Sequence, residues 1–165
     1  MKLRPATQSD IPLLQEWNEQ KHVKDAFGSD EMYDWEFELS RNADSEEILI
    51  AEAENRPIGL VVIGDPAQES HYWGDVEPNQ RAIDIWIGEE SDLGRGYGTQ
   101  MMRLALERCF RPPDVRAVIL DTLVSNTKSH RFYERLGFTK IDRRVFESEE
   151  CFVYRLERGD WAAEN

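Results

Sequence analysis

The sequence predicts a single mixed α/β domain over residues 1–165, with a central twisted sheet of six to seven strands and about four helices. Segments with strand-like alternation and segments with helical spacing follow one another in the order βααβββαβαββ. A chain of 165 residues, 40% of them hydrophobic, can bury one substantial core but is short for two. We find no internal repeat and no low-complexity segment that would indicate another architecture.

The N-terminal part is expected to form one strand and two helices. Residues 1–7 are strand-like, and Ser9 or Asp10 can cap the helix that follows. A second helix is expected from about Asp30, capped by Ser29 or by Asp30 itself, because hydrophobic side chains then recur at helical spacing.

The middle of the chain predicts a β-hairpin, a long loop and a further strand. Residues 46–53 and 58–64 are two β-rich runs joined by a turn. Residues 65–81 are polar and contain prolines, so we expect a loop there, and loops of this length tend to carry function. Residues 82–88 alternate, with isoleucines on one face and Asp84 on the other.

The C-terminal half is predicted to complete the sheet. A helix follows the stretch "DLGRGYG" and ends before "RPPD", because consecutive prolines prevent its continuation. A strand then ends at Asp121, and the next helix is capped by Ser125 or Asn126. Residues 138–146 and 151–158 are expected to form two antiparallel strands.

The charge of the chain restricts its partners. The formal net charge is −13, which disfavours binding to nucleic acid or to an anionic membrane surface and favours a cationic small molecule. The start "MKLRPATQSD" has no apolar segment of a signal peptide, and no apolar run approaches the length of a bilayer. We therefore expect a cytoplasmic protein that acts as a monomer or a homodimer.

The cysteines and histidines do not form a recognisable metal site or disulfide framework. Cys109 and Cys151 lie far apart without a CxxC motif, and the three histidines have no metal-ligand spacing. Cys109 is expected to be a buried small hydrophobic residue.

The stretch "DLGRGYGTQM" has glycines at 94, 96 and 98 and continues directly into a helical pattern. It matches neither the dinucleotide fingerprint nor a Walker A loop. A flexible turn is one interpretation. The other is a backbone cradle for a phosphate, which the preceding strand, the helix start and Arg95 within the loop favour.

This stretch and a later one, "SNTKSHRFYERLGF", resemble the two characteristic blocks of the GNAT superfamily of N-acetyltransferases. The resemblance implies the GNAT fold and an enzyme that uses acetyl-CoA as co-substrate, without a metal. Leu93 stands where the pyrophosphate-binding loop usually has Gln or Arg. The cofactor-binding residues that the resemblance implies are Ile87, Leu93, Gly94, Arg95, Gly96, Tyr97, Gly98, Thr99 and Asn126.

The resemblance also implies how the acetyl donor is activated. Tyr133 matches a tyrosine whose phenol lies near the cofactor sulfur, where it can protonate the departing thiolate. An aromatic residue at this helical spacing is also typical of a core position. A backbone amide near Ile87 or Gly88 is expected to polarise the thioester carbonyl. Asn126 can cap its helix and also hydrogen-bond the pantetheine arm.

Within the superfamily the chain is most similar to aminoglycoside 6'-N-acetyltransferases, through "AIDIWIG" and "LDTLVSNTKSHRFYERLGF". In that group the aspartate matching Asp84 is a base or an amine ligand, and the one matching Asp121 binds the cationic substrate. Tyr72 and Trp73 are either core residues or the walls of an amine pocket. Asp84 also has a structural interpretation at a solvated strand edge.

The expected reaction is therefore acetyl transfer from acetyl-CoA to a primary amine of an aminoglycoside-like cation. A protein N-terminal amine, a polyamine or a siderophore precursor are alternative acceptors. A catalytically idle acyl-CoA-binding module that regulates a partner is the alternative from another functional class.

Overall fold

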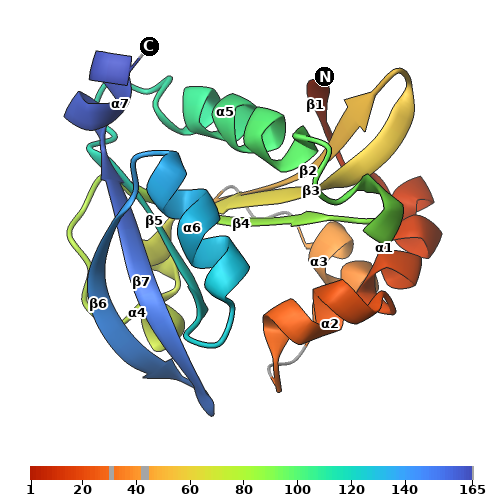
Figure 1. Cartoon of the computed structure of the whole chain (residues 1–165), viewed down its shortest axis with the longest axis horizontal. Coiled ribbons are helices and arrows are strands. Elements are labelled where there is room, and N and C mark those ends of the chain that lie inside the picture. The colour runs from red at the N-terminus through yellow and green to blue at the C-terminus, as the bar shows by residue number, and fades with distance from the viewer. Residues whose placement is uncertain (30–31, 42–44, 165) are drawn as a thin grey trace.

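A seven-stranded sheet crosses the molecule, and helices cover both of its faces (Figure 1). The computed structural model describes residues 1–29, 32–41 and 45–164. The strand order is β1-β2-β3-β4-β5-β7-β6, and neighbouring strands are antiparallel except for the parallel pair β4 and β5. The mixed α/β class and the strand count expected from the sequence are confirmed.

Each strand lies close to where the alternation of the sequence predicts it. The strands are β1 Lys2–Pro5, β2 Glu46–Ala53, β3 Arg56–Gly64, β4 Gln80–Ile87, β5 Ala117–Leu123, β6 Thr139–Phe146 and β7 Glu149–Glu157. The helices are α1 Ile11–Asn18, α2 Lys21–Phe27, α3 Trp35–Ser40, α4 Ser70–Trp73, α5 Tyr97–Cys109, α6 Thr127–Arg135 and α7 Arg158–Glu164. Four of these correspond to the expected helices, and α2, α4 and α7 are additional short ones. Within the described ranges, no helix has the length and apolar character needed to cross a membrane.

The second expected helix begins later than its periodicity indicates. It starts at Trp35, where the Asp34 side chain accepts a hydrogen bond of 3.2 Å from the Phe37 amide and so caps the first turn. Ser29, expected as a cap, instead donates its backbone amide to the Glu149 carboxylate at 2.7 Å. Asp30, the other expected cap, lies outside the described residues.

Two further boundaries differ from expectation. Part of the expected loop at 65–81 is ordered into a 3-10 turn, Pro66–Gln68, and helix α4, because the Asp65 side chain caps the turn by accepting from the Ala67 amide at 3.0 Å. Strand β5 does not end at Asp121 but continues to Leu123, since β7 still pairs with it there.

The two faces of the sheet bury different clusters. Isoleucines 83, 85 and 87 of β4 pack on one face with α5 and α6, as the alternation predicts, and Cys109 is buried there. On the opposite face one cluster joins Trp17 of α1 and Trp35 of α3, and a second joins Trp73 of α4 and Phe146 of β6. The two clusters on that face are separate, and the surface of the sheet between them is not part of either cluster.

Strands β4 and β5 pair only briefly within the part of the chain that the structure describes. The parallel register joins Gln80 to Ala117, Arg81 to Val118 and Ala82 to Ile119. Asp84 and Asp121 each lie two residues beyond the last registered pair, on the same face as Ala82 and Ile119. The two aspartates are thus placed at the point where the strands separate, as the diverging ribbons in Figure 1 illustrate.

The end of β4 is built around a glycine, which gives a test of the fold. A Cβ atom on Gly88 would lie 2.0–2.4 Å from atoms of the buried Trp17 indole. We expect Gly88→Ala to lower the free energy of unfolding by about 1–3 kcal/mol, the usual cost of overpacking, as measured by urea denaturation. Gly159→Ala is the control, since no described atom lies within 4 Å of its Cβ position; an equal loss in both variants would contradict this explanation.

Candidate active site

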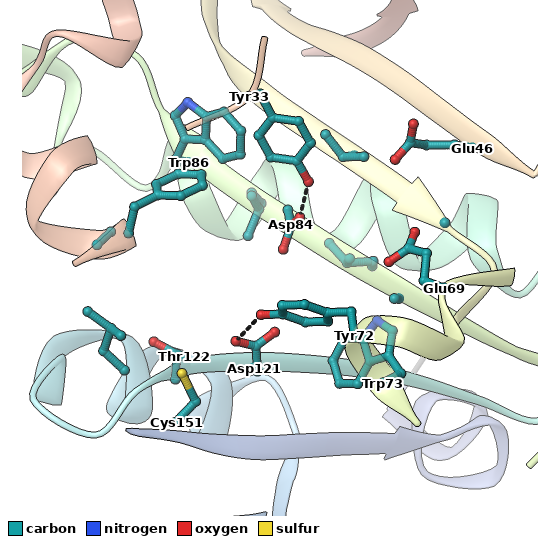
Figure 2. Close-up of a pocket in the computed structure, with 18 of the residues that line it drawn as sticks. Tyr33, Glu46, Glu69, Tyr72, Trp73, Asp84, Trp86, Asp121, Thr122 and Cys151 are labelled. Atoms are coloured by element: carbon teal, nitrogen blue, oxygen red, sulfur yellow. Dashed lines mark hydrogen bonds between the residues drawn. The ribbon is translucent and has the colours of Figure 1, made fainter. Parts of the chain in front are cut away.

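A cavity of about 500 Å³ occupies the separation between β4 and β5. Its wall includes residues from the segment before α3, from β2, α4, β4, β5 and α6 (Figure 2). The polar residues among them that bear on chemistry are Tyr33, Glu46, Glu69, Tyr72, Asp84, Asp121, Asn126 and Tyr133. The structure therefore brings together Asp84, Asp121, Tyr72, Trp73, Asn126 and Tyr133, all of which the sequence singles out.

Two tyrosine–aspartate pairs face each other across this cavity (Figure 2). The Tyr33 hydroxyl donates a short hydrogen bond to Oδ2 of Asp84. The Tyr72 hydroxyl donates to Oδ2 of Asp121 at 3.1 Å. Burial, and then the negative charge of the neighbouring aspartate, raises the pKa of both phenols, so both remain protonated donors. The sequence does not indicate Tyr33, because no periodic pattern marks the extended segment that carries it.

Further carboxylates make the cavity strongly acidic. Burial, with a contribution from nearby negative charge, raises the pKa of Glu46 and of Glu69. Arg41 offsets part of this charge through an ion pair of 2.5 Å with Glu46. The pKa of the Asp84 carboxyl is raised, because desolvation by the surrounding protein outweighs the opposing effect of the hydrogen bond from Tyr33. A ligand with several positive charges matches this arrangement.

Tyr133 reaches the cavity from the opposite side of the sheet. It is 8% exposed and belongs to the core that α5 and α6 form with the sheet, yet it lines the same cavity as Asp84 and Asp121. Burial, followed by the charges of these aspartates, raises the pKa of its phenol, which therefore keeps its proton at neutral pH. Tyr133 is therefore both a core residue and a residue of the cavity wall.

The glycine-rich stretch forms an open turn at the start of α5. Gly94 and Gly96 have φ angles of +72° and +82°, a conformation that glycine adopts without strain, and Gly96 is the residue that precedes the helix. No described atom lies within 4 Å of either Cβ position, so there is room for a ligand. The first amides of a helix have no intrahelical acceptor and favour an anion. The turn fits a pyrophosphate.

Asp92 anchors this turn to the hairpin. It is 2% exposed and accepts hydrogen bonds of 2.6 and 2.8 Å from the Arg56 guanidinium. Arg95 also lies 3.2 Å from Asp92 and stacks over the Tyr97 ring at 5.4 Å. The positive charge of Arg95 is therefore partly neutralised by Asp92.

Among the remaining cofactor residues implied by the sequence, Leu93, Gly98 and Thr99 lie on or beside this turn, and Asn126 lies at the start of α6. The Leu93 side chain is 43% exposed, and its amide donates to the Glu90 carbonyl at 3.1 Å. Gly98 and Thr99 belong to the first turn of α5. The Asn126 side chain caps α6 by accepting from the Ser129 amide at 3.3 Å, as expected, and also lines the cavity.

The backbone at the end of β4 corrects one expectation. The Gly88 amide donates to the Ile58 carbonyl at 2.9 Å, so it is committed to β3, and its expected role toward a thioester is wrong. Because antiparallel pairing alternates, the amide and carbonyl of Ile87 point away from β3, toward β5. His22 of α2 lies against that carbonyl, with Nε2 at 2.9 Å.

Known proteins share both the sequence pattern and the fold. Residues 6–146 match the family model described as an acetyltransferase (GNAT) domain. Aminoglycoside N(6')-acetyltransferase type 1 from Klebsiella pneumoniae is 28% identical over 149 residues, which cover 84% of this chain and 73% of the relative. A kanamycin resistance protein from Rhizobium radiobacter is 32% identical over 74 residues, or 44% of this chain and 68% of the relative.

Solved structures extend the likeness to almost the whole chain. Aminoglycoside acetyltransferase AAC(6')-Ib in complex with coenzyme A and kanamycin has a TM-score of 0.85 at 25% identity, covering 98% of this chain and 97% of that one. Spermidine N-acetyltransferase from Vibrio cholerae, in complex with CoA and spermine, has a TM-score of 0.78 at 18% identity, with coverage of 98% and 97%. Since the family model spans most of the chain and the fold agrees with it, this protein belongs to the GNAT family of acetyltransferases.

Proposed function

We propose that this chain, as one domain over residues 1–165, transfers the acetyl group of acetyl-CoA to a primary amine of a cationic small molecule. The observation that carries the proposal is the placement of Asp84, Asp121 and Tyr133 in one cavity where β4 and β5 separate. The preferred acceptor is the 6'-amine of an aminoglycoside, supported by the relatives named above. Its use of acetyl-CoA fits a cytoplasmic location.

The donor would be held by the chain's own backbone. Amides at the start of α5, beyond Gly94 and Gly96, bind the pyrophosphate, with Arg95 beside them. The amide of Ile87, which points away from β3, would donate to the thioester carbonyl. Asn126, which lines the cavity, would hydrogen-bond the pantetheine arm. When bound, acetyl-CoA supplies an electrophilic thioester carbon in the cavity.

Two side chains account for the protons of the reaction. Asp84 accepts the proton that the substrate ammonium must lose, so the nitrogen lone pair becomes free to bond to the acetyl carbon. As the carbon–sulfur bond breaks, Tyr133 donates its phenolic proton to the sulfur, and the second proton that the nitrogen loses on becoming an amide restores the phenol. No described group hydrogen-bonds the Tyr133 hydroxyl, so its proton is available in the cavity. Asp121, held by Tyr72, pairs with a second positive charge of the substrate.

A polyamine is the second candidate acceptor. The carboxylates of Glu46, Glu69, Asp84 and Asp121 in one cavity match any small molecule that carries several ammonium groups. A protein N-terminal amine carries only one such charge at the reacting end, so the acidic cavity gives it less support.

The first experiment measures release of free CoA thiol from acetyl-CoA with aminoglycosides, polyamines and short peptides as acceptors. We expect turnover with an aminoglycoside, and a KM raised roughly tenfold or more in Asp121→Asn because a charge-assisted contact is lost. Asp75→Asn, outside the cavity wall, is the control. Tight CoA binding by calorimetry without turnover on any amine would instead indicate a binding module.

Asp84→Asn tests the proposed base. An amide cannot accept the ammonium proton as a carboxylate does, so we expect kcat to fall by about 10²–10⁴-fold. The affinity for acetyl-CoA, measured by calorimetry, is expected to stay within a factor of about two, because the proposed pyrophosphate site is separate. Unchanged kcat in Asp84→Asn would remove this residue from the mechanism.

Gly96→Ala tests the proposed cradle for the pyrophosphate. An alanine at φ +82° is strained by about 1 kcal/mol or more, and the turn relaxes away from its ligand-binding shape. We expect weaker binding of acetyl-CoA by calorimetry, by roughly fivefold or more, with the amine KM little changed. Gly159→Ala, on α7, serves as the matched control; equal affinities in all three proteins would place the pyrophosphate elsewhere.

A further inference from the structure

Tyr33 makes the hydrogen bond to the carboxylate proposed as the base. Its hydroxyl donates to Oδ2 of Asp84 although the two residues are 51 positions apart in sequence. The bond leaves Oδ1 of the same carboxylate directed to the cavity, where a substrate ammonium would approach (Figure 2). Oδ2 of Asp84 is thus bound by Tyr33, and Oδ1 faces the space in which a ligand would bind.

The backbone of Tyr33 is fixed by α1. The Asn18 side-chain amide donates to the Tyr33 carbonyl at 3.1 Å, and its oxygen accepts from the Trp35 indole at 3.1 Å. One asparagine side chain therefore holds the residues on both sides of Asp34. These two contacts restrain the backbone of Tyr33 relative to α1.

The ring of Tyr33 is fixed by aromatic neighbours. It stacks on Trp35 with ring centroids 4.9 Å apart and an interplanar angle of 9°, and on Trp86 of β4 at 5.9 Å and 29°. Phe27, at the end of α2, contacts Trp86 and Tyr33 edge-on at 5.4 and 6.2 Å. Because ring and backbone are both restrained, the hydroxyl has one direction in which to donate.

We propose that Tyr33 is a positioning residue that holds the Asp84 carboxylate in one orientation through its hydroxyl. The role as it bears on catalysis rests on the proposed function, in which Asp84 accepts the ammonium proton. The contact with Asp84 itself does not depend on the identity of the amine. Tyr72 is the internal comparison, since it donates in the same way to Asp121, which is not the proposed base.

The surroundings of Asp84 explain why such a donor is needed. Desolvation by the surrounding protein favours the neutral form of Asp84 and raises its pKa, whereas the Tyr33 hydrogen bond favours the carboxylate and lowers this pKa. The described titratable or charged groups that share the cavity with Asp84 are Tyr33, Glu38, Arg41, Glu46, Glu69, His71, Tyr72, Asp121, Tyr133, Glu147 and Cys151. Without the Tyr33 hydroxyl, Asp84 holds its proton to higher pH and is less available as a base.

The test is Tyr33→Phe, which keeps the stacked ring and removes the hydroxyl, with Tyr72→Phe as the matched control. We expect kcat to fall roughly tenfold, the order of one hydrogen bond to a charged group, and the acid limb of kcat to move to higher pH. Binding of acetyl-CoA should not change. In Tyr72→Phe the KM for the amine should rise while the acid limb stays in place.

A second readout needs no substrate. Titration of the Asp84 carboxyl by carbon-13 NMR, assigned with Asp84→Asn, should give a higher pKa in Tyr33→Phe than in the unaltered protein. Replacement of Tyr33 by 3-fluorotyrosine, a stronger donor that preserves the ring, should shift this pKa and the acid limb to lower pH. This variant also covers the case in which Tyr33→Phe does not fold.

The two readouts separate the two proposals. If no amine is acetylated but the Asp84 pKa rises in Tyr33→Phe and falls with fluorotyrosine, the proposed function fails and the hold of Tyr33 on Asp84 stands. If the amine is acetylated but neither the pKa nor the acid limb moves in these variants, Tyr33 is only a packing residue and the inference is overturned.

Discussion

The separation of β4 from β5 is the constraint on which the rest of the structure depends. A sheet that paired to its ends would place Asp84 and Asp121 in a closed ladder, with no volume between them. Because the register ends at Ala82 and Ile119, side chains from both faces meet in one cavity. The core on the side of α5 and α6 contributes Tyr133, and the opposite face contributes the two aspartates. The opening in the sheet thus makes the site.

Carboxylates that share such a cavity repel one another electrostatically, and neighbouring groups offset this repulsion. Tyr33 and Tyr72 each donate a hydroxyl to one aspartate, while Arg41 pairs with Glu46. These partners come from segments before α3, in α4 and after α3, none of which belongs to the central strands. The sheet supplies Glu46, Asp84 and Asp121, and the peripheral segments supply the groups that stabilise these carboxylates.

The sequence predicts most of this fold because its signals are local. The alternation of β4 places Asp84 opposite the core isoleucines, and the glycines before α5 mark a turn that the structure confirms. Tyr33 escapes sequence reasoning because its function depends on a partner 51 residues away and on the contact with Asn18, neither of which leaves a periodic pattern. The same holds for Ser29, whose contact with Glu149 spans 120 residues and replaces the local capping that its sequence position indicates.

The raised pKa values of Glu46, Glu69 and Asp84 couple the cavity to the proton concentration around it. A polycation that enters favours the ionised form of each carboxylate, so its arrival drives protons out into solvent. By the same linkage, acid opposes its entry, because protons and ammonium groups compete for the same oxygens. The affinity of the cavity for a polycation therefore rises with pH over the range in which these carboxyls titrate.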